Sequence, residues 1–376
     1  MAVVPAHTVA AALNALPYAR GASWDPDKGC LPGTRKAIFD DVWNWIDSPE
    51  SANSAEVLWI CDVAGSGKSS VAHSLCQQAK EKGMLWSCFF FDRMSAERNS
   101  PEKFVSTLVR DLAARDQRVA GVVAGILEND PSLCSASITR QFEGILLHPA
   151  LASYHRNGTR LLVVDALDEA CDKSLLALFC HGVRKLPRNW RIVLTSRPLS
   201  HLTRALQSAS HVKRYGRRLH GSEVLSDVEL FIRSRLLEIT ALGSFYCLAV
   251  HSEGLFQWAS TAIDSLACCS DAERQIHLIH SLVGSNALGE RMDILYAALL
   301  QGCPWEDDSF VQGYQQVVGT IVTVREPISC CALDELYQKH PHSSMHILEQ
   351  MGAFMSGYES PVEAVRLLHL SLRDYL

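Results

Sequence analysis

The feature that most constrains this chain is a short apolar run followed by a glycine-containing loop. Val57-Leu-Trp-Ile-Cys61 leads into Asp62-Val-Ala-Gly-Ser-Gly-Lys-Ser69, and a segment with helical apolar spacing follows. This order predicts a buried strand, a loop and a helix. The glycines let backbone N–H groups converge on one concavity, to which the helix adds the positive end of its dipole. Lys68 can then reach phosphates, and Ser69 can ligate Mg²⁺.

The first position of this loop departs from the usual phosphate-loop pattern. Glycine is expected with four residues between it and the Gly-Lys-Ser, and Asp62 stands there instead. Asp enters positive-φ conformations more readily than most non-glycine residues. Its charge would repel phosphates if it faced them. We therefore expect the Asp62 carboxylate to point away, toward a nearby N–H group or basic side chain.

A second apolar run ends in a cluster of acidic residues. Leu161–Val164 leads to Asp165, and Asp168 and Glu169 follow in the next loop. An acidic residue at a strand end beside a phosphate loop supplies the hard oxygen that Mg²⁺ prefers. Asp168 and Glu169 are then placed to orient or deprotonate an attacking water. An ordinary strand end with a solvated acidic turn is the weaker interpretation.

A third predicted strand, which starts at Arg191 and continues through Ile-Val-Leu194, ends in the polar residues Thr195 and Ser196 and then Arg197. An arginine at this position can sense or stabilise the charge of a γ-phosphate. A surface arginine beside a proline turn is a serious alternative.

Apolar strands alternate with helical segments up to about residue 220. The predicted strands are 57–61, 84–91, 159–164, 191–195 and 212–219. This alternation predicts an α/β fold with a parallel sheet covered on both faces. Ligands of such sheets bind at the carboxyl ends of the strands, where all three polar clusters lie. After residue 220 only helical patterns follow, so we expect a helical annex.

Composition excludes several classes. The 376 residues carry a net charge of −6, so we expect no nucleic-acid partner. No apolar stretch reaches the length of a membrane span, and no signal peptide is recognisable, so we expect no membrane partner and a cytoplasmic location. The 13 cysteines lack zinc-site or redox-motif spacing and are interpreted as free, mostly buried thiols.

The three motifs, taken in order, resemble those of the NACHT P-loop NTPases, and more narrowly the nephrocystin-like NACHT proteins of mushroom-forming fungi. Gly29-Cys-Leu-Pro-Gly-Thr-Arg35 resembles the segment before their NTPase domain, and Gly254-Leu-Phe-Gln-Trp-Ala-Ser260 resembles a helix after it. Arg366–Leu376 is similar to the winged-helix segment of NACHT receptors. The expected organisation is a loop-like, partly disordered lead-in (1–33), a P-loop NTPase core (34–220), a helical domain (221–300) and a winged-helix-like domain (301–376).

The resemblance assigns roles to residues of this chain. In NACHT receptors a winged-helix histidine contacts the β-phosphate of ADP, which makes His369 the candidate here; a histidine at the edge of an amphipathic helix is an equal alternative. Ser69 and Asp165 would hold Mg²⁺, and Asp168, Glu169 and Arg197 would act in hydrolysis. The expected nucleotide-binding residues are Asp62, Val63, Ala64, Gly65, Ser66, Gly67, Lys68, Ser69, Ser70 and His369.

The function that these features predict is a nucleotide-operated signalling switch. It would bind ATP or GTP with Mg²⁺, hydrolyse it slowly, with ATP the more expected nucleotide, and associate with itself or with related NACHT receptors. A nucleotide-binding adaptor without significant turnover is the alternative. A P-loop enzyme acting on a second substrate, such as a small-molecule kinase, is a third interpretation, for which the sequence shows no acceptor motif.

Overall fold

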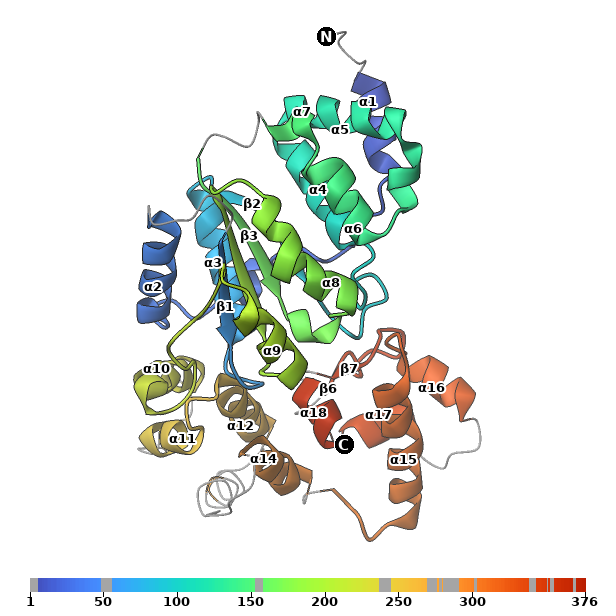
Figure 1. The fold of residues 1–376 in the computed structure, drawn as a ribbon. Coiled ribbons are helices and arrows are strands. Elements are labelled where there is room, and N and C mark those ends of the chain that lie inside the picture. The colour runs from blue at the N-terminus through green and yellow to red at the C-terminus, as the bar shows by residue number, and fades with distance from the viewer. Residues whose placement is uncertain are drawn as a thin grey trace. The chain divides into compact units, whose positions relative to one another are not determined.

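The computed structural model describes most of the chain in two compact units (Figure 1). The described residues are 6–48, 56–152, 158–236, 245–268, 291–300, 303–337, 343–349, 355–367 and 370–376, with positions 276, 279 and 351. The first unit consists of residues 1–63 and 68–218, and the second of residues 64–67 and 219–376.

The first unit is built on a five-stranded sheet of order β2-β3-β4-β1-β5. Its strands are β1 (Glu56–Cys61), β2 (Leu85–Phe90), β3 (Arg160–Asp165), β4 (Trp190–Ser196) and β5 (Val212–Arg214). All neighbouring strands run parallel. The predicted α/β fold with a parallel sheet is therefore confirmed. The last strand ends at Arg214, five residues before the predicted end, and its residues Lys213 and Arg214 are exposed at the sheet edge.

Helices cover both faces of this sheet, which explains the uninterrupted apolar runs. Every residue of β3 and β4 is buried. Figure 1 shows α3 (Lys68–Glu81) and α8 (Lys173–Ala177) on opposite sides of the strands. Further helices of this unit are α4 (Phe104–Arg115), α5 (Gln117–Asn129), α6 (Ile138–Gln141), α7 (Pro149–Ala152) and α9 (Ser200–Ser208).

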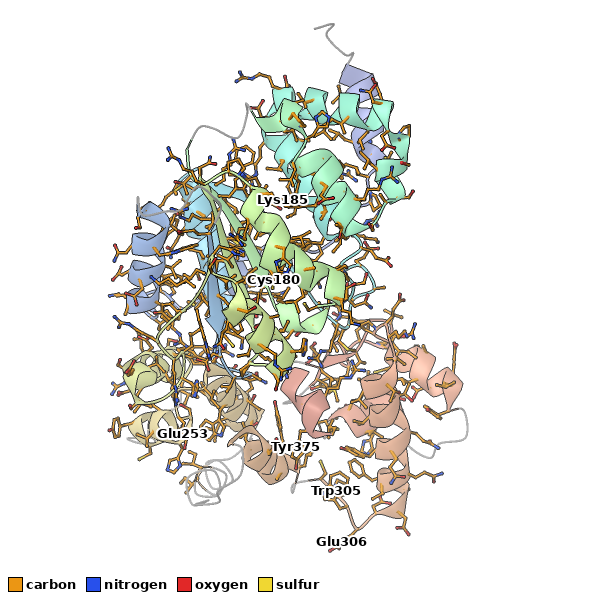
Figure 2. The ribbon with its side chains drawn as sticks, in the orientation of Figure 1. Cys180, Lys185, Glu253, Trp305, Glu306 and Tyr375 are labelled. Carbon is orange, nitrogen blue, oxygen red and sulfur yellow. The ribbon has the colours of Figure 1, made fainter. Side chains whose placement is uncertain are left out.

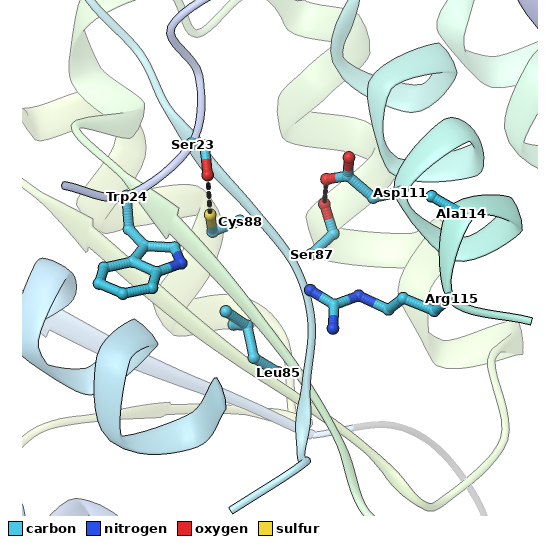
Figure 3. Close-up of a pocket in the computed structure, with 8 residues that line it drawn as sticks. All are labelled: Ser23, Trp24, Leu85, Ser87, Cys88, Asp111, Ala114 and Arg115. Carbon is cyan, nitrogen blue, oxygen red and sulfur yellow. Dashed lines mark hydrogen bonds between the residues drawn. The ribbon is translucent and has the colours of Figure 1, made fainter. Parts of the chain in front are cut away.

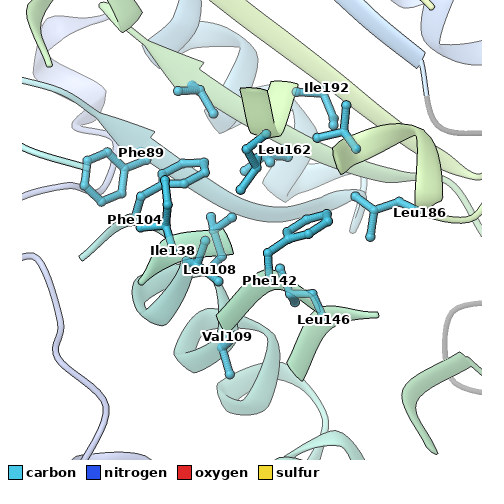
Figure 4. Packing of buried hydrophobic residues seen from close by; sticks show 14 of the residues in the cluster. Phe89, Phe104, Leu108, Val109, Ile138, Phe142, Leu146, Leu162, Leu186 and Ile192 are labelled. Carbon is cyan, nitrogen blue, oxygen red and sulfur yellow. The ribbon is translucent and has the colours of Figure 1, made fainter. Parts of the chain in front are cut away.

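The main core of the first unit lies between the sheet and the helices that follow β2 (Figure 4). Phe104 of α4 is fully buried, and its ring centroid lies 5.3 Å from that of Phe89 and 5.8 Å from that of Phe179. Leu162 and Ile192 contribute from β3 and β4. This packing fixes the strands whose carboxyl ends carry the polar clusters.

The lead-in predicted to be loop-like contains one helix at Ala6–Asn14, and its residues 15–33 are loop apart from a 3₁₀ turn at Pro26–Lys28. This helix is α1, and Lys36–Asp47 form α2 after it. Leu16, Ala19 and Ala22 are at most 1% exposed and join the main core. These short apolar side chains are spaced without the period of a helix or a strand, so the sequence pattern does not reveal their burial.

The lead-in segment is also bonded to the helix that follows the glycine loop. The backbone N–H of Asp25 donates to His73 Nδ1 at 2.9 Å, and that of Cys30 donates to Ser74 Oγ at 2.8 Å. The imidazole of His73 stacks on Phe90 with a centroid distance of 4.0 Å, and burial lowers the pKa of His73 to about 4. His73 is therefore a neutral acceptor that anchors the lead-in to α3.

The second unit is helical in the residues that follow the core. Its first part contains α10 (Leu225–Arg235), α11 (Phe245–His251), α12 (Phe256–Cys268) and α14 (Arg291–Leu300). Trp258 and Tyr296 are almost fully buried and belong to one apolar cluster with residues up to Leu372. None of the described helices is both long and apolar enough to cross a lipid bilayer.

The end of the second unit has the element order of a winged helix. Helix α15 (Asp308–Thr323) is followed by Ser329, then by α16 (Cys330–Leu336) and α17 (Ser344–Glu349). Strands β6 (Met355–Ser356) and β7 (Arg366–Leu367) form an antiparallel ribbon, and Ser329 bridges to Ala364 beside it. Helix α18 (Leu370–Tyr375) ends the chain.

Candidate functional site

The glycine loop between β1 and α3 has two glycines in the left-handed backbone region. Gly65 and Gly67 have φ angles of 74° and 87°, which residues with a Cβ rarely adopt. Helix α3 begins at Lys68, so the loop leads directly into the first turn of a helix. Ser66 is fully buried, whereas the side chain of Val63 is on the exposed side of the loop. A curled backbone that leads into a helix is an arrangement in which N–H groups can converge on an anion.

Lys68 folds back onto the start of its own loop. Its Nζ donates to the carbonyl oxygen of Asp62 at 2.9 Å and to that of Val63 at 2.7 Å. Burial lowers the pKa of Lys68, and the nearby carboxylates of Asp168 and Asp165 oppose this shift. The ammonium group is thus held between loop carbonyls and acidic groups.

The Asp62 carboxylate accepts a hydrogen bond from a backbone N–H of the loop. Its Oδ1 accepts a hydrogen bond of 2.7 Å from the backbone N–H of Val63, and Asp62 is only 5% exposed. Its own backbone N–H donates to the carbonyl of Ser196 at the end of β4. The carboxylate therefore has a nearby N–H partner, as expected.

Asp165 sits at the end of β3 in a completely buried position beside two hydroxyl groups. Thr195 donates to Asp165 Oδ1, and the Ser69 hydroxyl lies near enough to this carboxyl to lower its pKa. Burial raises the pKa of Asp165, while these hydroxyl groups and Lys68 act in the opposite direction. The two oxygens expected to bind Mg²⁺, those of Ser69 and Asp165, are therefore already adjacent. Their chemistry and proximity fit the ion.

Asp168 and Arg197 form a pair at the ends of β3 and β4. The backbone N–H of Arg197 donates to Asp168 Oδ1 at 2.9 Å, and Arg197 Nε lies 3.5 Å from Asp168 Oδ2. The Asp168 side chain is 4% exposed and its charge acts on Lys68. The structure thus places Asp168 between the lysine of the loop and the arginine.

Glu169 has a different environment from Asp168. Its Oε2 accepts a hydrogen bond of 3.0 Å from the backbone N–H of Arg93, in the loop that follows β2. Burial raises the pKa of Glu169 to about 7, and the Arg93 N–H and charge oppose the shift. Asp168 and Glu169 have the same predicted role, but their carboxylates have different hydrogen-bond partners.

The sheet register brings these groups to one edge. Cys61 of β1 pairs with Ser196 of β4, and Val164 of β3 pairs with Leu194 of β4. The loop start, the acidic cluster and the Arg197 segment therefore follow three adjacent strands. His369 lies outside the described residues, so its place is not part of this geometry.

Thr195 is a site residue that the sequence analysis did not single out for a role. Its hydroxyl donates to Asp165 Oδ1 and accepts from the backbone N–H of Ala166 at 3.0 Å. Ala166 has a left-handed backbone (φ 55°), which turns the chain directly after Asp165. The signal in the sequence was a hydroxyl residue at the end of an apolar strand beside the acidic one.

A separate pocket of about 240 Å³ lies against the edge strand of the sheet (Figure 3). Trp24 and Arg115 face it from the lead-in segment and the end of α4. Asp111 forms part of its wall and accepts hydrogen bonds from Ser87 and Tyr18. The pocket contains none of the residues predicted for nucleotide binding. Its lining consists of Ser23, Trp24, Leu85, Ser87, Cys88, Asp111, Ala114 and Arg115.

The sheet order and the glycine loop place the first unit in the P-loop class of α/β folds. Residues 33–197 match the family model described as Nephrocystin 3, N-terminal, a span of less than half of the chain. That span includes the loop, the acidic cluster and Arg197. No curated protein matches the chain.

Solved structures with a distant likeness cover most of the chain. Cdc6p from Pyrobaculum aerophilum has 12% sequence identity and a TM-score of 0.37, over 92% of this chain and 93% of that one. The Orc1 protein from Aeropyrum pernix, in complex with DNA, has 15% identity and a TM-score of 0.35, over 91% of each chain. At these scores the likeness carries no argument about ligands or partners.

The Asp62 hydrogen bond generates a prediction with a matched pair of variants. Asp62→Asn removes the charge but keeps an oxygen that can accept the Val63 N–H, so we expect ADP affinity within about threefold of the parent. Asp62→Gly also removes the acceptor, and we expect binding to weaken by about threefold to tenfold. Isothermal titration with ADP measures both. Tightening by tenfold or more in both variants would show that the carboxylate faces the phosphates.

The pKa of Glu169 generates a prediction about stability and pH. In the unfolded chain this carboxyl ionises near pH 4.5, and in the folded chain near 7. Between these values the folded state binds more protons, so its stability falls as pH rises. Glu169→Gln should therefore become more stable than the parent by up to about 3 kcal/mol from pH 5 to pH 8. Urea unfolding measures this difference, and parallel stability curves would contradict it.

Proposed function

We propose that this protein is a nucleotide-operated switch of the NACHT NTPase kind, which binds ATP or GTP with Mg²⁺ and hydrolyses it slowly. One observation carries the proposal. A lysine, a strand-end carboxylate and a second carboxylate, Lys68, Asp165 and Asp168, act on one another electrostatically beside a loop with two left-handed glycines. A parallel sheet binds its ligand at this edge. The match to the nephrocystin model over residues 33–197 supports the narrower class.

Different groups of the loop and of the strand end would bind the phosphates and the Mg²⁺ ion. The backbone N–H groups from Ala64 to Ser70 would receive the phosphates, because they lie in a curled loop that opens a helix, whereas the Val63 N–H donates to Asp62. Lys68 would leave the carbonyls of Asp62 and Val63 and neutralise the outer phosphates. Ser69 and Asp165 would hold Mg²⁺, which when bound screens phosphate charge.

The two carboxylates after Asp165 have separate roles in this proposal. Asp168, which lies near Lys68 and beside Arg197, would orient the attacking water. Glu169, with a pKa raised to about 7, would accept a proton near neutral pH and hold the Arg93 loop in place. Arg197 would exchange its Asp168 partner for the γ-phosphate, so that breaking their pair is part of the transition to hydrolysis.

A nucleotide-binding adaptor without significant turnover is a second candidate, and one feature of the site favours it. Arg197 is engaged by Asp168 through both its backbone N–H and its guanidinium group. A site that keeps this pair in the nucleotide complex would bind nucleotide without a free water-orienting group.

Loss of Lys68 tests nucleotide binding, and a phosphate-release assay separates the two candidates. Purified parent protein should carry a nucleotide identifiable by mass spectrometry, and Lys68→Ala should lose it, with affinity lowered by at least about tenfold. Asp168→Asn should reduce phosphate release by about a hundredfold. No release above background from the parent would favour the adaptor, whereas equal nucleotide content in the parent and Lys68→Ala would overturn the proposal.

The switch itself requires ADP and ATP to differ in their affinity for two forms of the chain. By the resemblance, His369 donates to the β-phosphate of ADP and holds the closed form. Opening would then permit association with further copies or related receptors in the cytoplasm.

His369→Ala should therefore weaken ADP binding and shift the chain toward the associating form. We expect a loss of ADP affinity of about tenfold or more, in the range of usual coupling free energies. ADP titration and sedimentation velocity on the same samples measure the two effects. Equal ADP dissociation constants for the variant and the parent would exclude this role.

A further inference from the structure

The segment Gly254-Leu-Phe-Gln-Trp-Ala-Ser260 has a built-in start for helix α12. Gly254 has a φ of 82°, and a Cβ added to it would lie 2.5 Å from both Gly221 N and Val224 Cγ2. The backbone N–H of Gly221 in turn donates to the carbonyl of Glu253 at 2.6 Å. Trp258 is buried in the apolar cluster of the second unit. Together these contacts fix where α12 begins.

The first turn of α12 presents a backbone donor to the glycine loop, whose residues 64–67 belong to the same unit. The backbone N–H of Gln257, the second residue of the helix, donates to the carbonyl of Gly65 at 3.2 Å. The first N–H groups of a helix have no partner within it, so this bond satisfies one of them. A Cβ on Gly65 would lie 2.9 Å from Gln257 Cβ. Gly65 is therefore required by close approach as well as by its φ.

This bond also orients a loop N–H group. The peptide between Gly65 and Ser66 is planar and trans, so its C=O and N–H point in opposite directions. Holding the Gly65 carbonyl toward Gln257 turns the Ser66 N–H away from α12. In a phosphate loop such an N–H is a ligand for the phosphates.

The side chain of Gln257 continues the connection within the second unit. Its Nε2 donates to the hydroxyl of Tyr296 at 3.1 Å. Tyr296 is fully buried on α14, and its ring centroid lies 5.4 Å from that of Tyr375. Tyr375, labelled in Figure 2, is the last residue of helix α18. A continuous chain of contacts thus runs from Gly65 through Gln257 and Tyr296 to the C-terminal helix.

We propose that Gln257 is a positioning residue of the phosphate loop and that the Gln257–Tyr296–Tyr375 chain couples the loop conformation to helix α18. The proposal rests on the proposed function only in that the ligand of the loop is a nucleotide. A ligand that accepts a hydrogen bond from the Ser66 N–H in this orientation stabilises the bond between Gly65 and Gln257. Loss of the Gln257 contacts would free the Gly65–Ser66 peptide to rotate and would weaken binding of that ligand.

Tyr296→Phe in the full chain tests this coupling, with Tyr337→Phe as a matched control. Tyr296→Phe removes the hydroxyl that accepts from Gln257 and keeps the buried ring. Tyr337→Phe removes a hydroxyl bonded to Thr320 at 2.6 Å, elsewhere in the same unit. Amide hydrogen exchange without nucleotide should be at least about threefold faster over residues 62–69 in Tyr296→Phe, and unchanged over β3. ADP affinity should fall by about threefold to tenfold.

The outcomes separate this inference from the proposed function. If the parent binds no nucleotide, the proposed function fails, and the exchange of the loop still decides the coupling. If the parent binds ADP but Tyr296→Phe and Tyr337→Phe show the same loop exchange and affinity, the coupling is overturned. Gln257→Met, which keeps the backbone donor and loses only Nε2, replaces Tyr296→Phe if that variant does not fold, with the same expected results.

Discussion

The parallel pairing of β4 with both β1 and β3 is the constraint on which the candidate site depends. β4 lies between the strand that precedes the glycine loop and the strand that ends in Asp165. Because all three run in one direction with nearly level ends, residues about a hundred positions apart meet at one edge. A shift of register by one residue would turn Asp165 and Thr195 to the other face of the sheet. Such a shift would also break the hydrogen bond between Thr195 and Asp165.

This arrangement buries several charged groups away from water. Their shifted pKa values reflect the unfavourable free energy of burying those charges. Burial raises the pKa of Asp165 and Glu169 and lowers that of Lys68, so each charged form is disfavoured by its surroundings. The hydrogen bonds from Thr195 and from the Arg93 N–H offset part of this cost. A triphosphate with its metal ion would supply the countercharges that the protein provides only in part. Binding of the proposed ligand would therefore offset part of the unfavourable free energy of burying these charges.

Local sequence patterns predicted the parts of this site, and long-range contacts decided how the parts interact. The apolar runs and the glycine spacing identified β1, β3, β4 and the loop, because burial on two faces leaves a direct mark on composition. The pairing of Arg197 with Asp168 left no such mark, since it joins two loops 29 residues apart. Helix α9 was not predicted from the sequence. Its buried residues Leu202 and Leu206 stand among mostly polar residues, so the apolar pattern is weak. The buried lead-in escaped notice because small apolar residues without a period resemble a loop.

Two requirements act on Gly65, and together they would give the proposed switch a physical basis. The positive φ of Gly65 curls the loop, as binding of phosphates would require, and the absence of a Cβ admits Gln257. A ligand that changes the first arrangement changes the second, because both act on the same peptide group. Coupling of this kind is reciprocal: if the bond between Gln257 and Gly65 strengthens nucleotide binding, bound nucleotide stabilises that bond by the same free energy. The Gly-Leu-Phe-Gln-Trp-Ala segment and the phosphate loop would therefore change conformation together.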